Sequence, residues 1–174
     1  MYYISHDTQR NGRAQLTYKN GTLYNFANLF MLSWPYANVR VMSSYYFTDT
    51  DAGPPSVGVQ GGSNCADGKN WVCEHRWSQI GNMVAWRNAA GTSDIANWST
   101  GSANQIAFSR NGNAFIAFNR DSHNSWQAGT LYTGLPAGTY CNVLAGGDSA
   151  DQPASCTSTV TVDSSGNVSG LVVP

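Results

Sequence analysis

The sequence has few charged residues, and this scarcity excludes two classes of protein. Only 11% of the 174 residues are Asp, Glu, Lys or Arg, and the formal net charge at pH 7 is -1. No basic stripe is present, so the sequence does not predict nucleic-acid binding. Intrinsic disorder is excluded because hydrophobic residues make up 41% of the chain and aromatic residues 12%.

The sequence also lacks long apolar runs and zinc-binding motifs. No stretch reaches the roughly 20 apolar residues of a membrane-spanning helix, so no membrane insertion is expected. There is no C-x-x-C motif and no histidine cluster, which argues against a zinc site. The length suffices for one modest hydrophobic core or two small ones.

The chain does contain four cysteines: Cys65, Cys73, Cys141 and Cys156. Each close pair spans a loop that a disulfide can bridge, but four cysteines allow three connectivities and the spacing does not choose among them. Cys65 lies in a long loop, 48–69, rich in Gly, Ser, Asp and Pro. Disulfides indicate an oxidising, extracellular setting. The alternative is four reduced cysteines in a cytosolic protein.

The first candidate for chemistry lies at the beginning of the chain. Residues 2–4 form an aromatic and β-branched run, typical of a buried strand, and polar residues follow at once. In parallel α/β folds, polar residues just past the carboxyl end of a strand carry the chemistry. Asp7 is therefore the first candidate catalytic carboxylate. The alternative is that 6–8 only caps the loop after a strand.

Apolar spacing predicts two helices and a second strand in the first half of the chain. Residues 22–34 carry an apolar face at helical spacing, and 39–42 is predicted to be a buried strand that completes a right-handed βαβ unit. A second helix is predicted over 70–90, with Asn70 as its N-cap and Gly91 just past its end. Glu74, the only glutamate, falls in the first turn, where a carboxylate favours the helix dipole.

Helical periodicity stops at residue 91, and short strands are predicted from there on. Residues 104–110 and 113–118 flank Asn111-Gly112, which predicts a hairpin with a type I′ turn. Further strands are predicted at 128–133, 138–144, 158–163 and 168–173. We therefore divide the chain into an α/β part, 1–90, and an all-β part, 91–174.

Several blocks together resemble one protein family. Ser5-His6-Asp7-Thr8-Gln9-Arg10 resembles the Asn-His-Asp-x-Gln-Arg block of the α-amylase family of glycoside hydrolases, in its animal-like secreted branch. Further similar blocks follow in the family's order at 23–36, 40–45, 53–55, 71–77 and 134–141. The resemblance implies the last βα units of a (β/α)8 barrel followed by a C-terminal Greek-key β-sandwich. A complete barrel takes roughly 250 residues, so only part of one is expected.

The resemblance also implies roles for individual residues. Asp7 matches the carboxylate that stabilises the transition state, and His6 matches the substrate-binding histidine. Arg40 matches the chloride-binding arginine; the alternative is a buried strand arginine paired with a carboxylate. The family uses calcium and chloride, but no complete site for either is expected in this chain. The resemblance favours the two local disulfides, Cys65 with Cys73 and Cys141 with Cys156.

The implied activity is endo-hydrolysis of α-1,4-glucosidic bonds in starch, with retention. The family's nucleophile and acid/base match no residue here, so we expect the chain alone to be very weak or inactive. The alternative is a non-catalytic module that binds starch or a protein. The candidates for stacking on a sugar ring are Trp98 and Trp126. The alternative is that both are ordinary half-buried residues of the sandwich.

Two further expectations concern the setting of the chain. An export signal is absent from the sequence although secretion is expected, so Met1 is expected not to be the natural start of the gene product. Apolar barrel surface without its neighbours predicts self-association.

Overall fold

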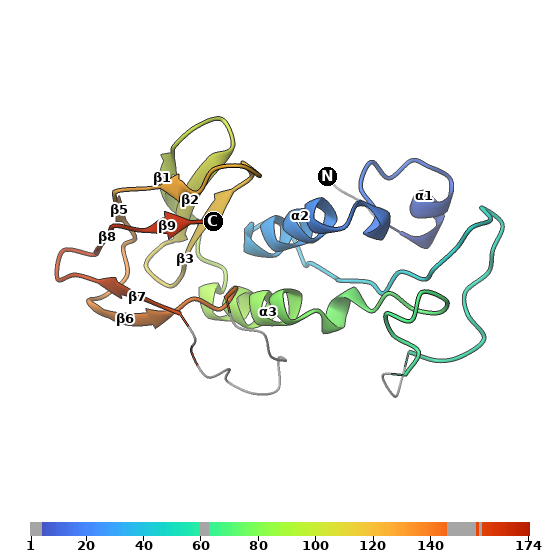
Figure 1. Cartoon of the computed structure of the whole chain (residues 1–174). Coiled ribbons are helices and arrows are strands. Elements are labelled where there is room, and N and C mark those ends of the chain that lie inside the picture. The colour runs from blue at the N-terminus through green and yellow to red at the C-terminus, as the bar shows by residue number, and fades with distance from the viewer. Residues whose placement is uncertain (1–4, 60–62, 146–155, 157) are drawn as a thin grey trace.

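The computed structural model describes residues 5–59, 63–145, 156 and 158–174. Helices occupy the first half of the chain and strands the second (Figure 1). The helical elements are α1 (His6–Arg10), η1 (Tyr18–Asn20), α2 (Thr22–Ser33), η2 (Glu74–Arg76) and α3 (Ser78–Ala90). The strands are β1 (Ile95–Thr100), β2 (Gln105–Arg110), β3 (Phe115–Asn119), β4 (Trp126–Gln127), β5 (Thr130–Tyr132), β6 (Gly138–Cys141), β7 (Thr159–Val162), β8 (Asn167–Ser169) and β9 (Val172–Val173).

The predicted helix over 22–34 is confirmed as α2. Its apolar face packs with α3 against the sheet of β1, β2 and β3, and this contact forms the larger core. In Figure 1, α2 and α3 lie between the strands at one end of the molecule and α1 with the 48–69 loop at the other. The fully or nearly buried members of this core are Leu29, Leu32, Ile80, Met83, Phe108, Ile116 and Phe118.

The predicted strand over 39–42 is wrong. The backbone of these residues is not paired with any strand, and among the described residues no strand precedes Ile95. A strand needs a neighbour to accept and donate its backbone hydrogen bonds, and no described segment lies beside 39–42 in that way. The other predicted strand of the βαβ unit, 2–4, lies outside the described residues.

The second helix is shorter than predicted. Residues 70–72 are extended, because Tyr46 N–H donates to Asn70 O (2.9 Å) and Val72 N–H donates to Ser44 O (2.8 Å). Cys73 is left-handed (φ 59°), and Trp77 is the N-cap of α3, so the prediction of Asn70 as N-cap was wrong. Glu74 lies in the first turn of η2 rather than of the helix predicted over 70–90, and it is fully buried. Gly91, with φ 58°, ends the helix as predicted.

The predicted hairpin is confirmed. Strands β2 and β3 pair antiparallel, and Asn111 (φ 42°) and Gly112 (φ 79°) both have the positive φ that a type I′ turn requires. Strand β1, which was not predicted, pairs with the other edge of β2. Its register shifts between Ala96 and Ser99, so the alternation that identifies a strand is broken there.

The remaining strands pair antiparallel across long stretches of chain: β4 with β9, β5 with β8, and β6 with β7. All four further predicted strand regions contain strand, although 168–173 is split at Gly170 (φ 67°). A second core beneath them contains Ala107, Trp126, Leu131 and Val168. The all-β architecture predicted for this half is therefore confirmed.

Two arginines join the end of α2 to the neighbouring elements. Arg110, only 1% exposed, donates to Ser33 O (2.9 Å), Gly91 O (2.8 Å) and Ser93 O (2.6 Å). Arg87 donates to three further carbonyls, those of Leu32, Trp34 and Ala37. Burial, followed by the charge of Arg87, lowers the pKa of Arg110. These guanidinium groups satisfy carbonyls that the helix ends leave unpaired.

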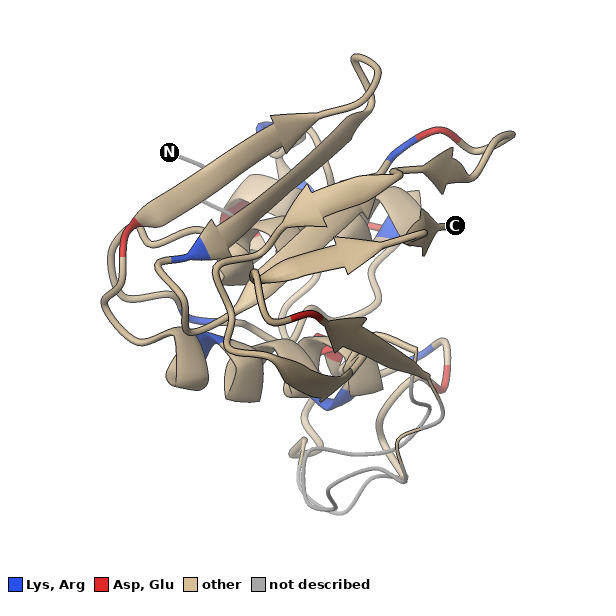
Figure 2. Cartoon of the chain, turned by 90° about the vertical axis from the view of Figure 1, so that its left-hand side faces the viewer, with Lys and Arg blue, Asp and Glu red and all other residues tan. Residues whose placement is uncertain are grey.

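The positions of charged residues are widely spaced along the ribbon on the side of the molecule that carries the strands (Figure 2). Among the described residues, no helix has the length and apolar character needed to cross a membrane.

Candidate active site

Helix α1 places His6 and Asp7 in a single capped turn. Ser5 is its N-cap: Thr8 N–H donates to Ser5 Oγ (3.2 Å), and Ser5 N–H donates to Thr8 Oγ1 (2.8 Å). This reciprocal capping makes residues 6–10 helical, where the sequence predicted polar residues in a loop after a strand. His6 and Asp7 are thereby held in fixed relation to each other.

Asp7 is the exposed carboxylate of this turn. Its side chain is 81% exposed, and Arg10 Nη2 lies 2.6 Å from its Oδ1. Arg10 also donates through Nη1 to Thr50 O (3.2 Å) and Ala52 O (2.7 Å), so it ties α1 to the long loop. An exposed ion pair contributes only about 0–1 kcal/mol to stability, so its main effect here is to orient the carboxylate.

An open hollow of about 490 Å³ surrounds this ion pair. It is lined by Asp7, Arg10, Asn11, Gly12, Thr50 and Asp51. The fold brings Asp51, a residue of the long loop, to the same hollow as Asp7. No local pattern identifies it, because the contact joins segments about 40 residues apart in sequence.

His6 is held by a backbone carbonyl. Its Nε2 lies 2.7 Å from Ser43 O, and since a carbonyl only accepts, Nε2 carries the hydrogen. In the tautomer that carries its single hydrogen on Nε2, Nδ1 is a hydrogen-bond acceptor. The ring lies against Tyr45, at 5.1 Å between centroids, and near Trp71, at 6.4 Å. The structure therefore places an imidazole acceptor among aromatic rings one residue before the exposed carboxylate, and His6 is not among the residues that line the hollow.

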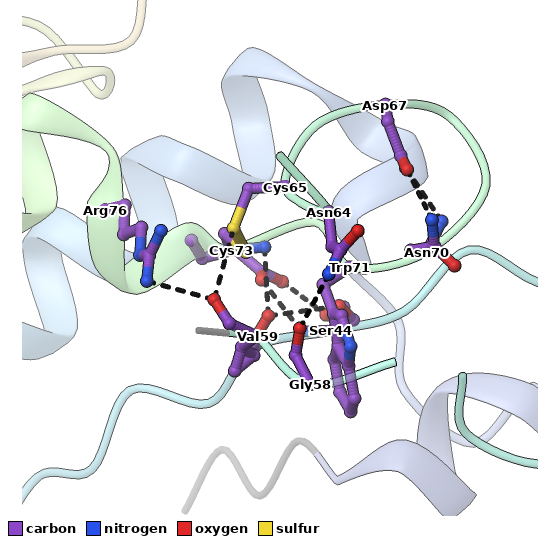
Figure 3. Close-up of a disulfide and its surroundings, with 12 residues drawn as sticks. Ser44, Gly58, Val59, Asn64, Cys65, Asp67, Asn70, Trp71, Cys73 and Arg76 are labelled. Carbon is purple, nitrogen blue, oxygen red and sulfur yellow. Dashed lines mark hydrogen bonds between the residues drawn. A yellow bond between two sulfur atoms is a disulfide. The ribbon is translucent and has the colours of Figure 1, made fainter. Parts of the chain in front are cut away.

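The His6 ring lies near Trp71, which belongs to a disulfide-bridged arrangement of short segments (Figure 3). Three short segments around Tyr45, Trp71 and Cys65 are joined by isolated antiparallel and parallel bridges. The Cys65–Cys73 disulfide closes this arrangement, as the resemblance implied, and the Cys141–Cys156 disulfide is confirmed as well. Asp67 turns the chain between the two cysteines: it accepts from the N–H groups of Asn70 and Lys69, which lower its pKa.

Arg40 lies apart from this arrangement. It is exposed, and it makes no hydrogen bond or ion pair with another described residue. The alternative prediction, a buried strand arginine paired with a carboxylate, is therefore wrong. Chloride binding by Arg40 stays a prediction. Within the described residues, no three His, Cys, Asp or Glu side chains are grouped as metal ligands.

The two candidate stacking tryptophans differ in exposure. Trp126 is 7% exposed and belongs to the smaller core, as the alternative prediction held. Trp98 is 49% exposed, and its ring stacks on Phe108 at 5.6 Å with an interplanar angle of 6°. Of these two tryptophans, Trp98 stays a candidate for contact with a sugar.

Comparison with known proteins decides the family. Residues 95–174 match the family described as the alpha amylase C-terminal all-beta domain. The whole chain is 44% identical over 177 aligned positions to an alpha-amylase of Tenebrio molitor, covering 96% of this chain and 36% of that protein. The chain belongs to the alpha-amylase family. An alpha-amylase-related protein of Drosophila pseudoobscura is 45% identical over 150 positions, covering 82% of this chain and 30% of the relative.

The similarity to amylases also holds for the three-dimensional structure, and it includes the helical half of the chain. A crystal structure of a mutant alpha-amylase I from Eisenia fetida, in complex with maltohexaose, is 34% identical with a TM-score of 0.79. The superposition covers 97% of this chain and 37% of that one. The chain spans about a third of the length of the amylases it matches. Its all-β half corresponds to the C-terminal domain of the family.

Proposed function

We propose that this chain supplies the transition-state-stabilising aspartate, Asp7, and the substrate-binding histidine, His6, of an α-amylase site. The substrate is an α-1,4-glucan such as starch, cleaved internally with retention. The observation that carries the proposal is α1 itself, a capped turn with an exposed carboxylate and an aromatic-flanked imidazole. The maltohexaose bound to the earthworm relative supports a glucan as the ligand class.

The geometry suits these roles. Glycoside hydrolysis passes through an oxocarbenium-like transition state, which a nearby negative charge stabilises. Asp7 is exposed and oriented by Arg10, so it can approach positive charge that develops on a sugar ring. The Nδ1 acceptor of His6 suits a sugar hydroxyl, and the neighbouring half-buried ring of Trp71 suits a pyranose face, whereas Tyr45 is buried.

We propose that the chain of 174 residues has very weak turnover or none. Hydrolysis needs a nucleophile and a general acid. The single glutamate is 0% exposed, so it has no access to a substrate. We also propose that the protein is secreted, since two disulfides suit an oxidising compartment.

Titration of the isotopically labelled chain with maltohexaose, followed by NMR, tests the site. We expect saturable shifts at the His6 and Asp7 signals that are lost in His6→Ala. Trp98→Ala is the matched aromatic control, and it is expected to bind as the wild type does. Binding that Trp98→Ala abolishes and His6→Ala leaves intact would instead support the second candidate function, a non-catalytic starch-binding module. The half-exposed Trp98 is the observation that favours that candidate.

A further inference from the structure

Glu74 forms a buried hydrogen-bond centre beneath the proposed site. Three donors converge on its carboxylate: Tyr24 Oη at 3.1 Å, Ser44 N–H at 2.8 Å, and the Ser44 hydroxyl. Among the described residues, it forms no salt bridge with a cation. A buried carboxylate is tolerated only where such donors satisfy it, so its contacts hold their donors firmly in place.

Ser44 connects the Glu74 carboxylate to α1. Gln9 Nε2 donates to Ser44 Oγ at 3.0 Å, and both residues are buried. Because Ser44 is bound to Glu74 through its backbone and its side chain, both its position and its rotamer are fixed. The buried face of α1 therefore rests on a serine that Glu74 orients.

Ser43, the residue before Ser44, connects the same hydrogen-bond network to His6. Its carbonyl accepts from His6 Nε2, and its hydroxyl accepts from Cys73 N–H at 2.9 Å. Cys73 is fixed in turn by the disulfide with Cys65. One dipeptide, Ser43-Ser44, thus holds α1 at both His6 and Gln9, the residues on either side of Asp7 and Thr8.

We propose that Glu74 is a positioning residue for the amylase site, acting through Ser43-Ser44 on His6 and thereby on Asp7. The inference rests on the proposed function for its consequence in glucan binding. The positioning itself is a property of the unliganded chain, so it can be measured separately.

Glu74→Gln is the sharpest substitution, because it keeps the size of the side chain. One oxygen becomes an NH₂ donor that faces either Ser44 N–H or the two hydroxyls. If it faces the hydroxyls, Ser44 Oγ must accept from it in competition with Gln9. We expect the His6 ring to lose its single Nε2–H form, and the affinity for maltohexaose to fall about tenfold, which corresponds to about 1.4 kcal/mol.

The readout is the ¹⁵N NMR spectrum of the His6 ring and of the α1 amides in the full chain without ligand. The wild type is expected to show a protonated Nε2 and an unprotonated Nδ1, and Glu74→Gln a mixture of both tautomers. The control is Thr133→Val, which removes a buried hydroxyl that donates to Gly166 O at 2.8 Å in the β domain. It is expected to lower stability and leave the His6 ring unchanged.

A folded Glu74→Gln with an unchanged His6 ring would overturn the proposal. If that variant does not fold, Ser44→Ala takes its place, since it keeps Glu74 and removes only the hydroxyl that Gln9 contacts. An unchanged ring in Ser44→Ala would overturn the proposal equally. Absence of maltohexaose binding by the wild type would contradict the proposed function, while the ring spectra would still decide the role of Glu74.

Discussion

Tyr24 shows how strongly single buried residues depend on partners far away in sequence. Burial, and then the charge of Glu74, raises its pKa to about 12 from an ordinary value of 10.0. The folded state therefore holds the phenol proton more tightly than the unfolded state does. The resulting contribution to the free energy of unfolding is complete below about pH 10 and is lost as the pH rises through about 12.

Tyr24→Phe is expected to remove this alkaline loss of stability. The variant loses a hydrogen bond to a carboxylate, so its free energy of unfolding at neutral pH is expected to be about 1.5–3 kcal/mol lower. Urea unfolding at a series of pH values is the measurement, with the exposed Tyr132→Phe as control. A wild type and a Tyr24→Phe variant that lose stability in parallel above pH 10 would contradict this interpretation.

At the scale of elements, local signals were predictive and long-range partners were not. Helix α2 and the β2–β3 hairpin follow from apolar spacing and from Asn111-Gly112, which act within a few residues. The predicted strand over 39–42 and the helix start at Asn70 failed because backbone partners decide them. Asp7 was singled out by its position after a predicted strand, and the family resemblance gave Asp7 and His6 their predicted roles. Ser44 and Asp51 carry no such local signal.

The junction between β2 and the end of α2 depends on Arg110. Arg110→Lys keeps the charge but loses the planar fork that reaches three carbonyls. We expect the free energy of unfolding to fall by about 1–3 kcal/mol. Urea unfolding measures this, and Arg120→Lys, an exposed position, is the matched control with an expected change near zero. Equal effects of the two variants would contradict the role given to Arg110.

The turn between β1 and β2 needs glycine at 101 for reasons of space. A Cβ there would lie 2.6 Å from Nε1 of the buried Trp126, and still closer to Gln105 Oε1. We expect Gly101→Ala to lower the free energy of unfolding by about 1–3 kcal/mol. Gly53→Ala, which meets nothing within 4 Å, controls for the backbone effect of the substitution. Thermal unfolding that shows equal effects would refute the steric explanation.

At the scale of the whole molecule, a helical half and an all-β half share a core, and the all-β half matches the alpha amylase C-terminal domain. Self-association through apolar barrel surface stays a prediction, supported by the half-exposed Leu23 on α2 and Val84 on α3. Light scattering at increasing protein concentration is expected to show a rising mean mass. A constant monomer mass would contradict it.

The central claim is that this chain carries Asp7 and His6 but neither a nucleophile nor an acid for glycoside cleavage. Release of reducing sugar from soluble starch, measured for the purified chain and for Asp7→Asn, tests it most directly, with a complete α-amylase as positive control. We predict no release above the blank by either protein. Release by the wild type that disappears in Asp7→Asn would contradict the claim, because other carboxylates would then complete the site.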